Sequence, residues 1–271
     1  MCYACNKGGD LVRGCSCRGP SAGICHLACL LNFAEAQICD KDYFDTLNKC
    51  GQCQQNFQGT VRLALARARW LHFADRPETD EWRFQARLDL GMYLDFLRAY
   101  DAEAEAVLAE CVEAGHRVWG HTVTFTINAE RCFAVHLSKK GRPEQERALD
   151  ILTRIYKLYA ESFGPEHNDT LYVLGDLAVT HRRLGNYVKE EELYRKELAA
   201  WRRTKGENNM RTMESRYFLV SCLLVQDKFD AARAEYAGLL PLAERVLGPE
   251  NALVRKLREP ALQAALRGRF Y

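Results

Sequence analysis

The sequence lacks the features that would direct it to a membrane or to a nucleic acid. It has no run of about 18 apolar residues, so it predicts no membrane-spanning helix. It has no basic block and its formal net charge is only +2, which gives no sign of nucleic-acid binding. Its first residues show neither the charged start nor the apolar stretch of a secretory signal peptide. These absences predict a cytoplasmic protein, with the nucleus left open, that binds neither membrane nor nucleic acid.

Motifs for the common hydrolase and transferase chemistries are also absent. The sequence contains no phosphate-binding loop, no nucleophile elbow and no metal-hydrolase helix motif. Most of its histidines are dispersed along the second part of the chain and are interpreted as surface or packing residues: His72, His116, His121, His136, His167 and His181. The sequence therefore predicts no catalytic nucleophile or general base.

What the chain does have is a cluster of cysteines at one end. Twelve cysteines are present, and nine of them fall within the first 53 residues: Cys2, Cys5, Cys15, Cys17, Cys25, Cys29, Cys39, Cys50 and Cys53. A reducing compartment keeps thiols free, so clustered cysteines there indicate a metal site rather than disulfides. The remaining three, Cys111, Cys132 and Cys222, lie in helical sequence and are predicted to be small buried hydrophobic side chains.

The spacing of these residues suits zinc. Two CxxC pairs, Cys2/Cys5 and Cys50/Cys53, bracket a CxC pair, Cys15/Cys17, and the segment Cys25 to Cys29 that contains His26. Two intervening residues allow a tight turn to present both sulfurs to one tetrahedral ion. Eight ligands predict two Zn²⁺ ions, and the spacing alone does not decide how the ligands are shared. Either Cys25 or His26 can supply the fifth ligand.

The order CxxC, CxC, HxxC, CxxC resembles the RING-CH variant of the RING finger. The resemblance implies a cross-braced module, in which Cys2, Cys5, His26 and Cys29 hold one zinc. Cys15, Cys17, Cys50 and Cys53 would hold the other, and Cys39 would be a spare thiol.

RING-type ubiquitin ligases carry no nucleophile and act by positioning a charged ubiquitin-conjugating enzyme. In the family, the docking groove uses apolar residues beside the zinc loops, and Phe33, with Leu30 or Leu31, is the match that this sequence offers. A competing interpretation is a zinc site that only folds its own small domain, because structural zinc contributes on the order of 10 kcal/mol to folding.

The character of the sequence changes at Thr60, where good helix formers with helical apolar spacing begin. The segment Arg76 to Asp80 predicts a break, with Thr79 or Asp80 as the cap of the next helix. No strand is predicted beyond this point.

A repeat of 42 residues is visible in the second half, as shown by Gly164, Gly206 and Gly248. Each period predicts two helices, typified by Thr170 to Leu184 and Tyr187 to Thr204. A last helix is predicted from about Leu253 to Arg267, as a solubilising cap.

The segments Gly164 to Leu171 (GPEHNDTL) and Leu184 to Tyr187 (LGNY) resemble the tetratricopeptide repeats of kinesin light chains. The resemblance extends from about Val118 to Leu266, with a looser hairpin from Asp80 to Gly115. Departures include Glu190, in a slot where the family prefers alanine, and a short insertion around 139–143. The resemblance implies an α-α superhelical solenoid that binds a protein partner on its concave surface, with Asp176, His181 and Ser215 as candidate contacts.

The sequence thus predicts a mainly α protein in three parts: a RING-CH-like zinc module at 1–59, a connecting helix and linker at 60–78, and tetratricopeptide-type repeats at 79–271. The predicted function is a zinc-binding protein–protein interaction adaptor. The alternative is a RING-type ubiquitin ligase whose zinc module docks a conjugating enzyme and whose repeats select the substrate.

Overall fold

The computed structural model describes residues 11–13, 24–26, 29, 32 and 57–266. Near its start, the short strands β1 (Leu11–Arg13) and β2 (Ile24–His26) pair antiparallel, with Val12 opposite Cys25. Most of the predicted zinc module lies outside the described residues.

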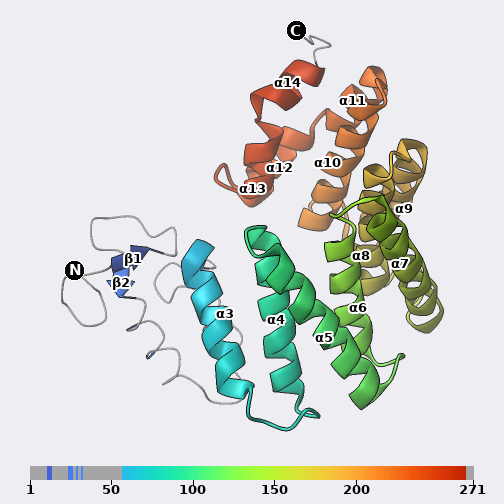
Figure 1. Ribbon diagram of the computed structural model, residues 1–271. Coiled ribbons are helices and arrows are strands. Elements are labelled where there is room, and N and C mark those ends of the chain that lie inside the picture. The colour runs from blue at the N-terminus through green and yellow to red at the C-terminus, as the bar shows by residue number, and fades with distance from the viewer. Residues whose placement is uncertain (1–10, 14–23, 27–28, 30–31, 33–56, 267–271) are drawn as a thin grey trace. The chain divides into compact units, whose positions relative to one another are not determined.

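From residue 57 onward the described chain is helical (Figure 1). Its helices are α3 (Gly59–Phe73), α4 (Glu81–Leu97), α5 (Asp101–Trp119), α6 (Thr124–Leu137), α7 (Arg142–Ser162), α8 (Asn168–Arg183), α9 (Tyr187–Lys205), α10 (Met210–Val225), α11 (Phe229–Tyr236), α12 (Leu239–Leu247), α13 (Ala252–Leu257) and α14 (Pro260–Leu266). The chain divides into two compact units, and the boundary falls within α6, between Phe133 and Ala134. None of the described helices is both long and apolar enough to cross a membrane.

In the first unit, α3, α4 and α5 pack around Leu63, Leu90, Leu94 and Ala104. The predicted cap is confirmed, because the Asp80 carboxylate accepts a hydrogen bond of 2.9 Å from the backbone N–H of Arg83. The helix predicted to connect the two parts of the chain, α3, packs directly against α4 through this core.

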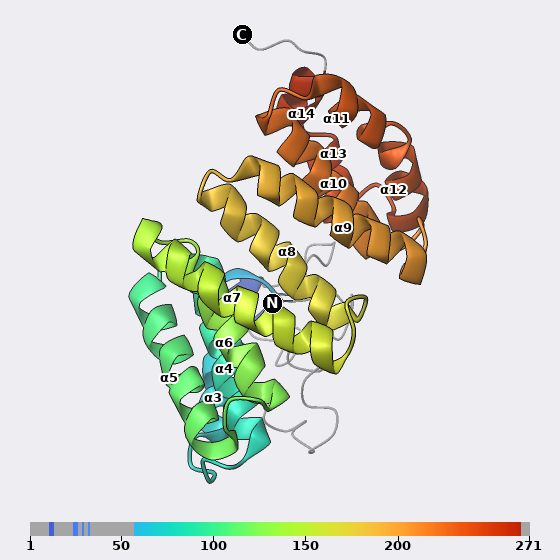
Figure 2. The same ribbon diagram turned by 90° about the vertical axis from the view of Figure 1, so that its right-hand side faces the viewer.

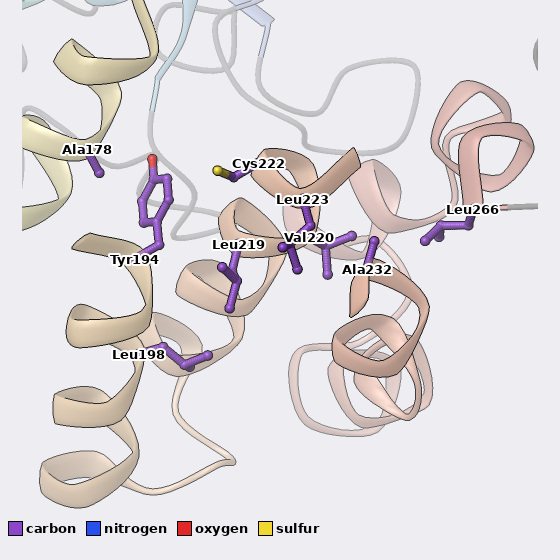
Figure 3. Packing of buried hydrophobic residues seen from close by; sticks show 9 residues of the cluster. All are labelled: Ala178, Tyr194, Leu198, Leu219, Val220, Cys222, Leu223, Ala232 and Leu266. Atoms are coloured by element: carbon purple, nitrogen blue, oxygen red, sulfur yellow. The ribbon is translucent and has the colours of Figure 1, made fainter. Parts of the chain in front are cut away.

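The second unit is built from helical hairpins. Figure 2 shows α8 and α9 side by side, with α10 following α9. Tyr194 and Leu198 project from α9 toward α10, where they meet Leu219, Cys222 and Leu223 (Figure 3). These residues are almost fully buried, so the apolar stripe of each helix is buried against the neighbouring helices.

The predicted repeat is confirmed as a recurring turn. Gly120, Gly164, Gly206 and Gly248 all have positive φ and follow the helices α5, α7, α9 and α12. Three residues after the glycine, a side chain caps the next helix in three of the four turns: His167, Asn209 and Asn251.

Two helix predictions need correction, and in both cases the cause is a proline. The helix predicted over Leu253 to Arg267 is divided into α13 and α14, because Pro260 cannot sit inside a continuous helix and instead starts a new one. The second helix of the last repeat is likewise divided into α11 and α12 at Gly238, three residues before Pro241.

Candidate functional site

Only two of the eight predicted zinc ligands lie in the part of the chain that the structure describes. His26 ends strand β2, where it pairs with Leu11, and Cys29 is half-buried three residues later. Cys2, Cys5, Cys15, Cys17, Cys50 and Cys53 lie outside the described residues, as do Cys39, Leu30, Leu31 and Phe33. The zinc module and its ligand pairing therefore stay predictions.

The three cysteines of the helical region are buried, as predicted for Cys111, Cys132 and Cys222. Burial raises the pKa of the Cys111 thiol to about 12, and burial followed by the nearby Glu190 carboxylate raises the pKa of Cys222 to about 12. Both thiols are therefore protonated at neutral pH and behave as packing groups.

The residues predicted as partner contacts do not share one environment. Ser215 is 1% exposed, and its hydroxyl lies 3.2 Å from Oε2 of Glu197, so it belongs to the packing between α9 and α10. His181 is half-buried, and burial lowers its pKa. Asp176 is also half-buried, at the middle of α8. Ser215 is therefore not accessible to a partner, contrary to the prediction.

The most perturbed carboxyl in the second unit is Glu197. It accepts hydrogen bonds from Nε1 of Trp201 at 3.1 Å and from the Ser215 hydroxyl. Burial raises its pKa to about 7, against the lowering effect of those two donors. Sequence patterning missed this pairing because Glu197 and Ser215 are 18 residues apart on different helices.

Glu190 fills a slot that alanine occupies in the neighbouring repeats, at Ala148 and Ala232. The side chain is fully buried and its pKa is raised by burial, opposed by the Arg182 guanidinium. The Nε of Arg182 lies 3.4 Å from Oε1 of Glu190. This departure from the repeat pattern is therefore an internal ion pair and not a surface feature.

An accessible groove of about 970 Å³ lies beside α3 and α4 in the first unit. Its polar rim is built from paired groups: the Tyr93 hydroxyl donates to the Gly59 carbonyl at 3.1 Å, and Asp89 accepts from Gln85 at 2.7 Å and pairs with Arg69 at 2.5 Å. These polar groups already have partners, and the Arg62 guanidinium lies over the Tyr93 ring, so the apolar side chains are the main contacts that the groove offers a ligand.

Those apolar side chains form a second stripe along α4. Trp82, Met92 and Phe96 line the groove, and the side chains of Met92 and Phe96 are 45% and 73% exposed. Leu90 and Leu94 face the core on the other side of the same helix. The i, i+4 spacing of Met92 and Phe96 was visible in the sequence, but a helix with apolar residues on two faces gives no indication of which face is covered.

Comparison with known proteins agrees with the repeat architecture. Residues 125–203 match the family model described as Tetratricopeptide repeat. No curated protein matches the chain.

Similar solved structures include the nearly identical TPR-like repeats assigned to a kinesin light chain of Podosopora anserina, at 14% identity and a TM-score of 0.56, covering 71% of this chain and 96% of that one. A variant of the same repeats is 12% identical, with a TM-score of 0.56, and the match covers 82% of this chain and 96% of that one. BtubC (BKLC) from P. vanneervenii is 14% identical with a TM-score of 0.55 and covers 77% and 92%.

At these identities the likeness concerns the fold. The helical region has a TPR-like solenoid fold, as the repeat pattern predicted.

Proposed function

We propose that the chain is a protein–protein interaction adaptor whose helical region holds a segment of a partner protein. Solenoids of stacked helical hairpins present extended surfaces suited to this task. The observation that supports the proposal most directly is the accessible groove beside α3 and α4, with Trp82, Met92 and Phe96 in its wall.

The chemistry of the groove defines the partner segment. Exposed aromatic and methionine side chains gain free energy when an apolar anchor covers them, about 1.5 to 3 kcal/mol for a large side chain that becomes fully buried. Methionine and aromatic residues are also enriched at binding surfaces. The partner therefore supplies an amphipathic segment with apolar anchors, rather than an acidic or basic tail.

A photo-crosslinking amino acid placed at Phe96 of the full chain tests this proposal. The same substitution at Leu71, which is 69% exposed but does not line the groove, is the matched control. We expect crosslinks to one partner segment from position 96 and none to that segment from position 71.

The affinity for that segment should then fall about 10-fold or more in Phe96→Ala and stay unchanged in Leu71→Ala. Equal losses in the two variants, or equal crosslinking, would contradict the groove as the binding surface.

The finer part of the proposal concerns residues 1–59, which we propose bind two Zn²⁺ ions through Cys2, Cys5, Cys15, Cys17, His26, Cys29, Cys50 and Cys53. Native mass spectrometry with and without a strong chelator tests it. We expect two zinc ions bound in the cysteine-rich segment, and a loss of its structure on chelation while the repeats stay helical. One ion or none in that segment would contradict the predicted ligand set.

The ligand order also supports a second candidate function, a RING-type ubiquitin ligase in which Phe33 contacts a ubiquitin-conjugating enzyme. Its expected site of action is the cytoplasm, with the nucleus left open. Discharge of ubiquitin from a charged conjugating enzyme, stimulated by the wild-type chain and not by Phe33→Ala, would support this activity. No stimulation across a broad panel of conjugating enzymes would leave the adaptor role alone.

A further inference from the structure

Three side chains of metal-binding type meet at the turn between α5 and α6. Nε2 of His116, in the last turn of α5, lies 2.8 Å from Oε1 of Glu130 in α6. The ring of His121, in the connecting turn, lies 4.0 Å from the His116 ring, centroid to centroid, and is tilted by 44° against it. One ligand atom from each of the three lies within 4.8 Å of the others. The sequence suggested dispersed histidines, and the structure brings these two together.

The turn itself brings these positions together. Gly120 has φ of 80°, a backbone conformation that favours glycine, and its N–H donates to the His116 carbonyl at 3.2 Å. The chain therefore reverses directly after α5 and carries His121 back over the last helical turn.

The same three positions converge in another copy of this turn. They are the residues four before, one after and ten after the glycine. In the turn at Gly206 they are Arg202, Glu207 and Arg216, and the Glu207 carboxylate lies 2.6 Å from Arg202 and 3.7 Å from Arg216. The convergence is thus a property of the repeat, independent of which residues occupy it.

The fold does not require polar groups there. At Gly164 the three positions are occupied by Ala160, Pro165 and Leu174, and at Gly248 by Glu244, Pro249 and Arg258. The last set forms an ordinary ion pair at 2.8 Å. Among the described copies of the turn, the one at Gly120 alone carries two imidazoles and a carboxylate.

We infer that His116, His121 and Glu130 form a binding site for a Zn²⁺ ion. Two histidines and one carboxylate are a known ligand set for zinc with an open fourth position. Zinc–ligand bonds of about 2.1 Å in a tetrahedron place the ligand atoms roughly 3.4 Å apart. Here Nε2 of His116 and Oε1 of Glu130 are 2.8 Å apart, and one ligand atom from each of the three residues lies within 4.8 Å of the others. Binding displaces the proton that His116 and Glu130 share in the hydrogen bond.

The surroundings favour a cation that remains accessible. The site lies at the C-terminus of α5, where the helix dipole is negative. Glu130 is only 6% exposed and His116 is 29% exposed, while His121 lies at the surface. The buried carboxylate fixes one ligand in place, and the exposed histidine leaves the fourth position open to water or to a donor from another molecule.

Zinc titration of the full chain, followed by native mass spectrometry, tests the inference. We expect wild type to bind one equivalent more than His121→Ala and one more than Glu130→Gln. His72→Ala, which removes an exposed histidine elsewhere in the same unit, should match wild type. Because His121 lies in an exposed turn, His121→Ala should keep the helical circular dichroism of wild type.

Cobalt substitution separates this site from the predicted cysteine ligands. Thiolate-bound Co²⁺ gives a sulfur-to-metal charge-transfer band, whereas a site of two imidazoles and a carboxylate gives visible d–d bands without it. His121→Ala should remove the second signal and leave any first signal unchanged. Equal zinc equivalents in wild type and His121→Ala would mean that His116 and Glu130 form an ion pair only, and would overturn the inference without touching the proposed adaptor function.

Discussion

The second helices of two successive repeats differ in a way that explains how the array tolerates sequence change. α9 runs unbroken over Tyr187–Lys205, whereas the corresponding segment one period later is divided into α11 and α12. Both segments begin with an aromatic residue, Tyr187 or Phe229, and both end at a glycine with positive φ. The residue types at both ends of the segment are therefore retained, while the backbone in its middle differs.

Pro241 accounts for the division. Within a continuous helix its ring would clash with the carbonyl of Ala237, four residues earlier. Ala237 instead adopts ψ of 126° and Gly238 adopts φ of 73°, so that Pro241 falls in the first turn of α12, where no N–H is required. The corresponding residue in α9 is the exposed Ala199.

The buried contents of the two segments differ as well. α9 buries Trp201 and Glu197, and one period later these positions hold Ala243 and Leu239. The unbroken helix thus carries a large aromatic ring and a buried carboxyl, while the divided one is filled by smaller apolar side chains. Substitutions at the positions that differ therefore test what determines the stability of each segment.

The largest expected loss of stability follows from replacing Trp201 of α9 by alanine, the residue at the corresponding position 243 of α12. Trp201→Ala removes a ring that is 1% exposed and packs on Leu171, Leu174 and Ala200. We expect the free energy of unfolding to fall by about 4 kcal/mol, measured by urea denaturation. Val188→Ala on the same helix, at a side chain 75% exposed, should change it by less than about 0.5 kcal/mol. A loss below about 1 kcal/mol for Trp201→Ala would contradict the packing described for α9.

The second-largest loss of stability is expected when a proline is introduced into α9, at the position that corresponds to Pro241. Ala199→Pro should cost about 3 kcal/mol, because the ring clashes with the carbonyl of Arg195 and the N–H of residue 199 is lost. Ala199 is exposed, so the substitution tests the backbone and not the core. Ala199→Ser is the matched control and should cost much less. Equal midpoints for the two variants in thermal unfolding would show that Pro241 is not what divides α11 from α12.

A smaller effect, and one that depends on pH, is expected at Glu197. Burial raises its pKa from 4.5 to about 7, so the ionised carboxylate destabilises the folded state. This cost is absent below pH 4.5, grows between pH 4.5 and about 7, and is constant above that range. Glu197→Gln keeps an acceptor for Trp201, so its stability relative to wild type should rise by about 3 kcal/mol between pH 4.5 and pH 8.

Urea denaturation of both proteins across that pH range measures the difference. Glu192→Gln, at an exposed position of the same helix, should show no such rise, since its pKa is lowered by hydrogen bonding to Lys189. A constant difference between Glu197→Gln and wild type would contradict a raised pKa at Glu197.

The smallest loss of stability is expected for a substitution at Gly238, between α11 and α12. Gly238→Ala places a side chain at φ of 73° with nothing within 4 Å of its Cβ, so the cost is that of the backbone alone, about 1 kcal/mol. Gly238→Asn is the matched control and should cost less, because asparagine tolerates the left-handed conformation better than alanine. Thermal unfolding compares the two variants, and a Gly238→Ala protein as stable as the control would refute a left-handed requirement at Gly238.

The repeat was predictable because its signals are local. Glycines at a fixed period end helices wherever they allow a left-handed turn, so the predicted helices Thr170 to Leu184 and Tyr187 to Thr204 match α8 and α9 closely. The divisions at Gly238 and Pro260 were missed because the apolar spacing continues through them, as at Tyr236 and Leu240. In both places the backbone requirement of proline outweighed helical periodicity.

The candidate sites were less predictable because they depend on contacts between helices. Ser215 has the spacing of an inward-facing polar residue, and its partner Glu197 follows only from how α9 packs on α10. The groove residues Met92 and Phe96, and the pairing of His116 with Glu130, likewise depend on which helix faces are covered. Periodicity identifies a face of a helix, but not what lies against it.

The division between α11 and α12 also affects how readily this segment can open locally. In a solenoid each hairpin is stabilised only by its own helices and its nearest neighbours. Helices of eight and nine residues are too short to persist alone, whereas α9 has nineteen residues in one cooperative ladder. We therefore expect the amide protons of 229–247 to exchange with solvent sooner than those of 187–205.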